Sequence, residues 1–510
     1  MFHSRWLRQV TVMACLGLTA PALAHDDSLD IVAPWEINSP NPSRAGHVFL
    51  RMQVAETLTD TDRKGRLSPG LATDWQVSED QLTWRFAIRQ GVQFHDGTEL
   101  TAALAADALQ RAASRPGMLD QVPIAAIEGR GNDVVIVLDS PYALLPALLA
   151  HSSTQILAPA SFGADGQALQ VIGTGPYAVT SLQTPQRLAV TRFDAYWGEP
   201  AAIEHASYLA APRGETRALM AQSGDADIVY TLDPASRLRL ERTANVVLFA
   251  EPIPRTVAIK VNAAHPALAE REARQALSQA IDRRGIATGI LRTPDAAANQ
   301  LFPPALTAWH QPGLAEQRHD LEAARETLAA LGWQRNAQGM LERDGQPFAL
   351  TLTTFADRPE LPIVATVLQD QWRQLGIDVS VNVGNASEIP AGHHDGSLDL
   401  GLMARNFGLV PDPLATLRED FGPQGGDWGA MNWSDPQLTE LLETLSQTSL
   451  PPEQRQTHIA EAATLLSQAM PVIPVAWYVQ TAAVTQQVEG FSIDPLERSY
   501  RLSDLRWSDT

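Results

Sequence analysis

Short strand-like segments alternate with longer helix-like segments along most of this chain, and this alternation limits the fold class more than any other feature. The apolar or alternating stretches 29–33, 84–89, 257–261, 348–355 and 377–381 have the pattern of strands. Between them, apolar residues spaced three and four apart indicate helices at 321–331, 364–375 and 459–470. Gly332, Gly376 and Pro471 follow these helices as stop signals. The pattern predicts an α/β fold.

The charge and the cysteine content exclude several classes of protein. The 510 residues include 58 acidic residues against 38 Lys and Arg, a net charge of −20, which argues against a nucleic-acid partner. The single cysteine, Cys15, excludes a disulfide framework and a cysteine-rich metal site. The chain also lacks the Gly-x-Ser-x-Gly and His-Glu-x-x-His motifs. A secreted hydrolase is therefore the least favoured alternative, and no catalytic residue is assigned.

Residues 1–24 have the organisation of an export signal. Arg5 and Arg8 precede an apolar run over 10–20, and Ala22 and Ala24 form a small-x-small cleavage site. Because the run is shorter than the ~20 residues that span a bilayer, we expect cleavage after Ala24 and soluble export. Lipid attachment at Cys15 is the alternative. Cleavage would remove the only cysteine.

Several short sequence motifs follow one another along the rest of the chain. The strings are Leu71-Ala72-Thr73-Asp74-Trp75, Thr83-Trp84-Arg85-Phe86, Val92-Gln93-Phe94-His95-Asp96-Gly97, Gly173-Thr174-Gly175-Pro176-Tyr177, Tyr196-Trp197-Gly198, Arg274-Gln275-Ala276-Leu277, Ala280-Ile281-Asp282-Arg283 and Asn432-Trp433-Ser434-Asp435-Pro436. Together they resemble the extracellular solute-binding proteins of ABC importers, family 5, which take peptides, nickel and metal chelates. The glycine string lacks the ending of a phosphate loop, so we interpret it as structural.

The resemblance implies a two-lobed periplasmic binding protein fold (type II, cluster C-like) with a hinge and an extra subdomain. By analogy, the first lobe comprises 25–46, 170–262 and 477–510, the extra subdomain 47–169, and the second lobe 263–476. The resemblance also implies a periplasmic, monomeric protein that closes around a small-molecule solute and delivers it to an ABC permease in the inner membrane. It implies neither an enzymatic activity nor a cofactor.

The string 405–413, Arg-Asn-Phe-Gly-Leu-Val-Pro-Asp-Pro, bears on the choice of solute. In the peptide-binding branch an aspartate of this loop holds the peptide amino terminus, and Leu409 stands at that position. The nickel and metal-chelate branch looks like Arg-Thr-Trp-Gly, which Arg405 to Gly408 match more closely. A chelate of nickel or another transition metal is therefore favoured over a di- or oligopeptide. Arg405 is the expected anion anchor, because a guanidinium suits carboxylates, with Asn406 as a hydrogen-bonding group and Phe407 as an apolar wall.

The chain departs from the nickel branch at several positions. Gln155 stands where that branch has an arginine, Pro411 replaces an aromatic residue, and 421–426 contains no histidine. Arg255 and Trp35 are further ligand-binding candidates; an exposed charge and a packed core tryptophan are the respective alternatives.

One group of metal-binding residue types stands out at 393–395. We interpret His393-His394-Asp395 as part of a surface loop, because adjacent residues rarely converge on one ion. The sequence therefore assigns no metal ligand.

Overall fold

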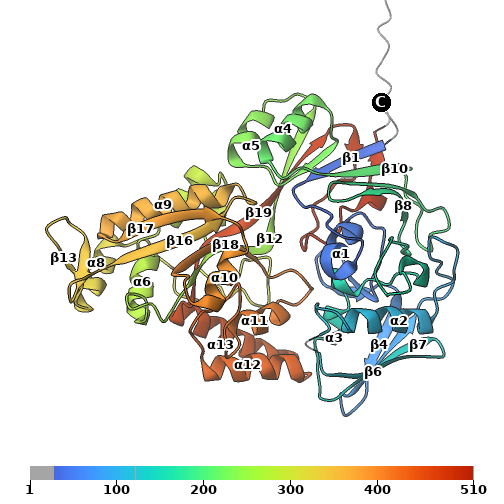
Figure 1. Ribbon diagram of the computed structural model, residues 1–510, viewed down its shortest axis with the longest axis horizontal. Helices are drawn as coiled ribbons and strands as arrows, with labels where there is room; N and C mark the ends of the chain where they lie inside the picture. The colour runs from blue at the N-terminus through green and yellow to red at the C-terminus, as the bar shows by residue number, and fades with distance from the viewer. Residues whose placement is uncertain (1–27, 121, 509–510) are drawn as a thin grey trace, which may run out of the picture.

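The computed structural model describes residues 28–120 and 122–508. A ten-stranded mixed sheet runs through both halves of the molecule, in the order β17-β16-β18-β12-β19-β11-β1-β10-β9-β8 (Figure 1). Its strands are β1 (Ser28–Ala33), β8 (Tyr177–Gln183), β9 (Arg187–Arg192), β10 (His205–Ala210), β11 (Ile228–Tyr230), β12 (Val246–Val261), β16 (Ala349–Phe355), β17 (Asp378–Gly384), β18 (Leu400–Asn406) and β19 (Val472–Thr485). The strands predicted at 29–33, 257–261, 348–355 and 377–381 are confirmed within this sheet.

Two long antiparallel strands, β12 and β19, connect the two lobes. Their pairing shifts register between Pro252 and Thr256. From Arg255 onward, β12 also pairs with β18 of the second lobe, whereas the far end of β19 pairs with β11 of the first. Figure 1 shows the two lobes on either side of these strands. The lobe and subdomain ranges stay predictions, and the change of partners lies a few residues before the boundary expected after residue 262.

A separate four-stranded antiparallel sheet lies within the range expected for the extra subdomain. Its order is β4 (Ala72–Val77), β5 (Thr83–Ile88), β7 (Asp133–Leu138) and β6 (Ile124–Arg130), and α2 (Ala102–Ala113) packs against β6 and β7. The glycine string lies against the backbone of residues 53–55, outside this sheet. A Cβ on Gly173 would lie 2.1 Å from the Val54 carbonyl oxygen, and one on Gly175 would lie 2.1 Å from that of Gln53. These glycines therefore permit a close backbone approach, as a structural string requires.

Helices cover the sheets in both lobes. Before β12 in the chain lie α1 (Pro42–Arg51), α3 (Leu145–Leu148), α4 (Gly214–Ser223) and α5 (Pro234–Leu240). The second lobe has α6 (Arg271–Gln279), α7 (Arg283–Gly285), α8 (Leu321–Ala330), α9 (Glu360–Leu375), α10 (Glu388–Asp395), α11 (Leu414–Phe421), α12 (Pro436–Gln447) and α13 (Pro452–Ala469). Short strands complete the fold: β2 (Thr59–Thr61), β3 (Leu67–Pro69), β13 (Gln334–Arg335), β14 (Leu341–Arg343), β15 (Gln346–Pro347), β20 (Val488–Glu489) and β21 (Arg506–Trp507).

Local signals explain where these helices begin and end. The Asp320 side chain accepts a hydrogen bond from the Ala323 amide at 2.9 Å at the start of α8, and Gly376 ends α9 with a φ of 94°. Both helices are confirmed. The prediction of a loop at His393-His394-Asp395 is wrong, because these residues form the last turn of α10, which Gly396 caps.

The described residues do not test the predicted export signal. The predicted signal at 1–24 lies outside the described residues. Among the residues that are described, no helix combines the length and the apolar character that crossing a membrane requires.

Glu56 makes the stability of the fold depend on pH. Its Oε2 accepts hydrogen bonds from the Thr174 hydroxyl at 2.7 Å and from Trp197 Nε1 at 3.1 Å. Burial nevertheless raises the pKa of Glu56 to about 7. Because the folded-state pKa lies above the ordinary value, the stabilisation is fully present at low pH and is lost as the pH rises through 7.

We expect this loss to appear in the melting temperature. Between pH 5 and pH 8, the melting temperature of the wild type should fall by several degrees more than that of Glu56→Gln, measured by differential scanning calorimetry. Exposed Glu326 provides the control Glu326→Gln, which should follow the wild type. Parallel curves for the wild type and Glu56→Gln would contradict the assignment.

Candidate functional site

A cavity of about 480 Å³ lies where strand ends of the two lobes face each other. The first lobe contributes Trp35, just after β1, and Thr231, just after β11; the second contributes Phe355, at the end of β16, and Arg358, just before α9. Strand ends are where α/β folds bind ligands, and the volume suits a small molecule. The other lining residues are Pro34, Glu36, Asn38, Pro212 and Asp357.

Arg358 supplies positive charge to this cavity. One of its terminal nitrogens is buried without a hydrogen-bond partner, and no carboxylate of the described residues forms an ion pair with it. Its guanidinium carbon lies 4.8 Å from the centre of the Tyr478 ring. Burial lowers the pKa of Arg358, but nearby Tyr478, Glu497 and Glu360 outweigh this effect and raise it. Arg358 is thus a charged donor with unused capacity, suited to an anionic ligand.

Trp35 lines the same cavity from the other lobe. The Tyr208 hydroxyl donates to the Trp35 carbonyl oxygen at 2.6 Å, and the Arg51 guanidinium carbon lies 4.0 Å from the centre of the indole ring. The first contact fixes the Trp35 backbone, and the second packs a guanidinium against the half-buried indole. It can therefore provide a flat apolar surface for a ligand.

A second, smaller pocket of about 60 Å³ also lies between the lobes. His47, His151 and Asn406 line it together with Arg51 and Glu497. Burial lowers the pKa of His47 to about 3 and that of His151 to about 4, so both imidazoles are neutral at pH 7. Trp35 and Arg51 both line a narrow space that also includes Glu497, so the small pocket lies close to the larger cavity.

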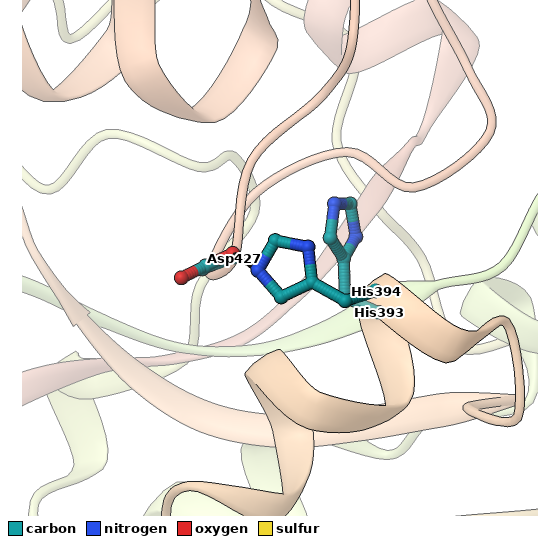
Figure 2. A group of neighbouring side chains, drawn as sticks. All are labelled: His393, His394 and Asp427. Carbon is teal, nitrogen blue, oxygen red and sulfur yellow. Dashed lines mark ion pairs between the residues drawn. The ribbon is translucent and has the colours of Figure 1, made fainter.

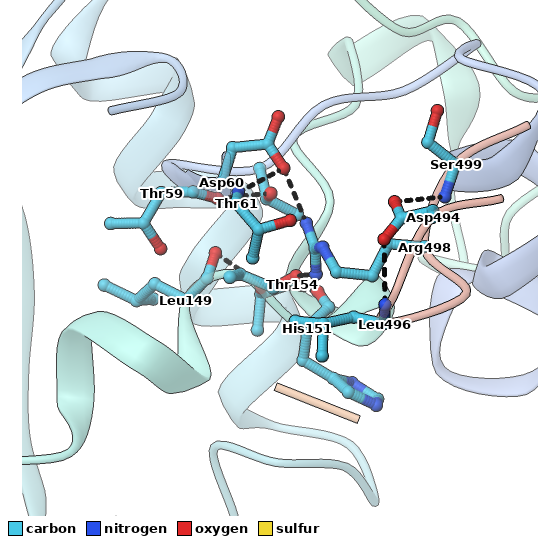
Figure 3. A network of polar contacts seen from close by, with 12 residues as sticks. Thr59, Asp60, Thr61, Leu149, His151, Thr154, Asp494, Leu496, Arg498 and Ser499 are labelled. Atoms are coloured by element: carbon cyan, nitrogen blue, oxygen red, sulfur yellow. Dashed lines mark hydrogen bonds and ion pairs between the residues drawn. The ribbon is translucent and has the colours of Figure 1, made fainter. Parts of the chain in front are cut away.

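A hydrogen-bond network fixes the loop that carries His151 (Figure 3). Arg498 donates to Asp60 Oδ1 at 2.9 Å and to the Ala150 carbonyl oxygen, and the Thr154 hydroxyl donates to the His151 carbonyl oxygen at 2.8 Å. The Ser153 amide donates to His151 Nδ1 at 3.1 Å, which leaves the proton of the neutral ring on Nε2. The neutral His151 ring therefore carries a hydrogen-bond donor at Nε2.

The structure places the string 405–407 largely within the second lobe. Arg405 donates from Nε and a terminal nitrogen to the two carboxylate oxygens of Asp420, each at 2.7 Å, and the Asp420 side chain is only 1% exposed. The Arg405 charge is thus matched inside the protein. The buried Phe407 ring packs 5.6 Å from that of Phe302, centre to centre, whereas Asn406 reaches the small pocket and accepts a hydrogen bond from the Gly408 amide.

Arg255 lies at the hinge and is also paired. It donates to Glu497 of the C-terminal segment, and both side chains are less than a tenth exposed. Of the five predicted residues, only Trp35 lines the large cavity. Arg358 was missed, although it follows the predicted strand 348–355 and the strand-end rule could have found it. No local signal in the sequence distinguishes His47 or His151.

Comparison with known proteins identifies relatives over nearly the whole chain. Residues 66–428 match the family described as "Bacterial extracellular solute-binding proteins, family 5 Middle". The "Nickel-binding periplasmic protein" of Escherichia coli K12 is 27% identical over 94% of each chain, and a "Glutathione-binding protein GsiB" of E. coli is 25% identical over 86% of each.

Solved structures show the same fold. NikA from Brucella suis in complex with Fe(III)-EDTA superposes with a TM-score of 0.83 at 22% identity, covering 94% of this chain and all of that one. The oligopeptide-binding protein AppA from Bacillus subtilis, in complex with a nonapeptide, gives a TM-score of 0.79 at 19% identity, covering 94% and 99%. The predicted two-lobed fold is thereby confirmed.

Proposed function

The chain belongs to family 5 of the bacterial extracellular solute-binding proteins, and from this premise we propose that it is the periplasmic component of an ABC import system for an anionic chelate of nickel or another transition metal. The cavity between the lobes, with Arg358 on one side and Trp35 on the other, is the observation that carries the proposal. A solute that contacts both lobes favours the closed state, which the permease then receives.

The residues around the cavity suit a ligand whose metal is already coordinated. A polycarboxylate chelate presents oxygens outward, and these can accept hydrogen bonds from the guanidinium of Arg358, one of whose terminal nitrogens has no partner. The Trp35 ring can cover the apolar part of the chelator. In this arrangement the protein binds the chelator, and none of its side chains has to ligate the metal. The anion contact is thus assigned to Arg358 rather than to Arg405, whose charge Asp420 already matches.

A di- or oligopeptide is the second candidate solute. Glu36 and Asp357, two exposed carboxylates, line the same cavity and can balance a peptide ammonium group. The structural similarity to an oligopeptide-binding protein agrees with this alternative but does not distinguish it, because the fold is shared.

Calorimetric titration of the ligand-free protein distinguishes the two solutes. We expect nickel–citrate or nickel–EDTA to bind at one per chain with a Kd of about 1 µM or tighter, which is about 8 kcal/mol, and a mixture of di- and tripeptides to give no heat. Metal-free citrate and EDTA are the controls. Binding of the peptides alone would overturn the proposal in favour of the alternative, and hydrolysis of the peptides would contradict a purely binding role.

A further inference from the structure

Two histidines and an aspartate from separate segments meet on the second lobe, away from the cavities described above. His393 and His394 lie in the last turn of α10, and Asp427 belongs to the loop 422–431 that follows α11 (Figure 2). The neighbouring Asp395 is not part of this group, and its carboxylate accepts a hydrogen bond from the Ser397 amide. The sequence string thus contains two of the three residues, and the fold supplies the third.

We propose that His393, His394 and Asp427 form a binding site for a divalent transition-metal ion. One donor atom from each residue lies within 4.8 Å of the other two, and His394 Nε2 is 2.9 Å from Asp427 Oδ1. The imidazole planes are inclined at 78° with ring centres 5.3 Å apart, so adjacent positions on the helix still direct nitrogens toward one region. The His394 and Asp427 side chains are 70% and 40% exposed, so they are free to rotate toward an ion.

The partly buried His393 has a ring nitrogen that no other group in the described residues contacts by a hydrogen bond. His393 Nδ1 is buried without a hydrogen-bond partner, which is a costly arrangement unless a ligand completes it. The C-terminal end of α10 also presents the negative end of the helix dipole to a cation.

Lys260 holds the loop that carries Asp427 in a fixed shape. Its Nζ donates to the carbonyl oxygens of Gly426 at 2.6 Å and of Gly429 at 2.9 Å. The ammonium charge opposes a second cation, but the carboxylates of Asp420 and Asp427 lie close to Lys260 and offset it. The loop therefore presents the Asp427 carboxylate without having to be ordered by the ion.

Two imidazoles and one carboxylate favour zinc, nickel or copper over magnesium or calcium. Three protein ligands leave a fourth position for water or for a donor atom of a chelator. The site does not depend on the proposed function, because its three residues lie outside the inter-lobe cavities and would bind metal even if the solute were a peptide.

Zinc sulfate without chelator is the probe that tests this site. We expect ligand-free full-length protein to bind one zinc ion, and His394→Gln and Asp427→Asn to weaken that binding at least 30-fold. Both residues are partly or largely exposed, so the variants should fold. His319→Gln, at another exposed histidine, is the matched control and should bind like the wild type.

A second readout uses cobalt in place of zinc. The visible absorption spectrum of bound cobalt should indicate nitrogen and oxygen ligands in the wild type and in Arg358→Gln. The same absorption bands should be absent from His394→Gln. Absence of zinc binding by the wild type, or zinc binding that neither His394→Gln nor Asp427→Asn weakens, would overturn the assignment.

Discussion

Arg405→Ala is expected to lower the free energy of unfolding by about 3–5 kcal/mol and to leave the affinity for the solute nearly unchanged. The substitution removes the partner of Asp420, which is almost completely buried, and leaves a carboxylate with an uncompensated charge. Burial already raises the pKa of Asp420, and the Arg405 guanidinium is the main group that opposes this effect. The loss should therefore be one of stability rather than of ligand contact.

Guanidinium unfolding, followed by tryptophan fluorescence, measures the first effect, and calorimetric titration measures the second. The exposed Arg373 on α9 provides the control Arg373→Gln, which should change neither quantity. The double variant Arg405→Met/Asp420→Leu should recover much of the lost stability, because it removes both charges from the buried site. An unchanged unfolding midpoint together with a tenfold or greater loss of affinity would restore Arg405 as the anion anchor.

The fold was predictable to the extent that local signals determine it. The Asp320 cap and the Gly376 stop mark the ends of α8 and α9 because capping acts within one turn of the helix. The two-lobed architecture itself came from the resemblance, since strand order depends on pairings between segments far apart in the chain, such as that of β12 with β19. Periodicity carries no information about such pairings.

The candidate site was less predictable, for a physical reason. An arginine is available to a ligand only if no carboxylate of the protein already pairs with it. Asp420 lies beside Arg405 only because α11 folds back against the strand that carries Arg405. Arg358 and Trp35, more than 300 positions apart, face one cavity only because two lobes meet. Likewise, Asp427 joins His393 and His394 through a loop contact. Residue type indicates the chemistry, but tertiary neighbours decide whether it is used.

Arg358→Gln is expected to weaken binding of the metal chelate by about 100-fold, close to 3 kcal/mol. The guanidinium is the cavity's cation, and a hydrogen bond to a charged group is worth more than a neutral one. Glutamine keeps a polar group that can still contact the Tyr478 hydroxyl, so the neighbouring packing should survive.

Calorimetric titration with nickel–citrate measures this loss, and a series of variants separates charge from geometry. Arg358→Lys keeps the charge but not the planar fork of donors, so its affinity should lie between those of the wild type and Arg358→Gln. Arg373→Gln should bind like the wild type. If the solute is instead a peptide held by its ammonium group, Asp357→Asn should be the damaging change and Arg358→Gln should not weaken binding. An anionic chelate needs the Arg358 cation, whereas a peptide ammonium group needs the Asp357 carboxylate. The two variants, Arg358→Gln and Asp357→Asn, therefore distinguish the two candidate solutes by which of them loses affinity.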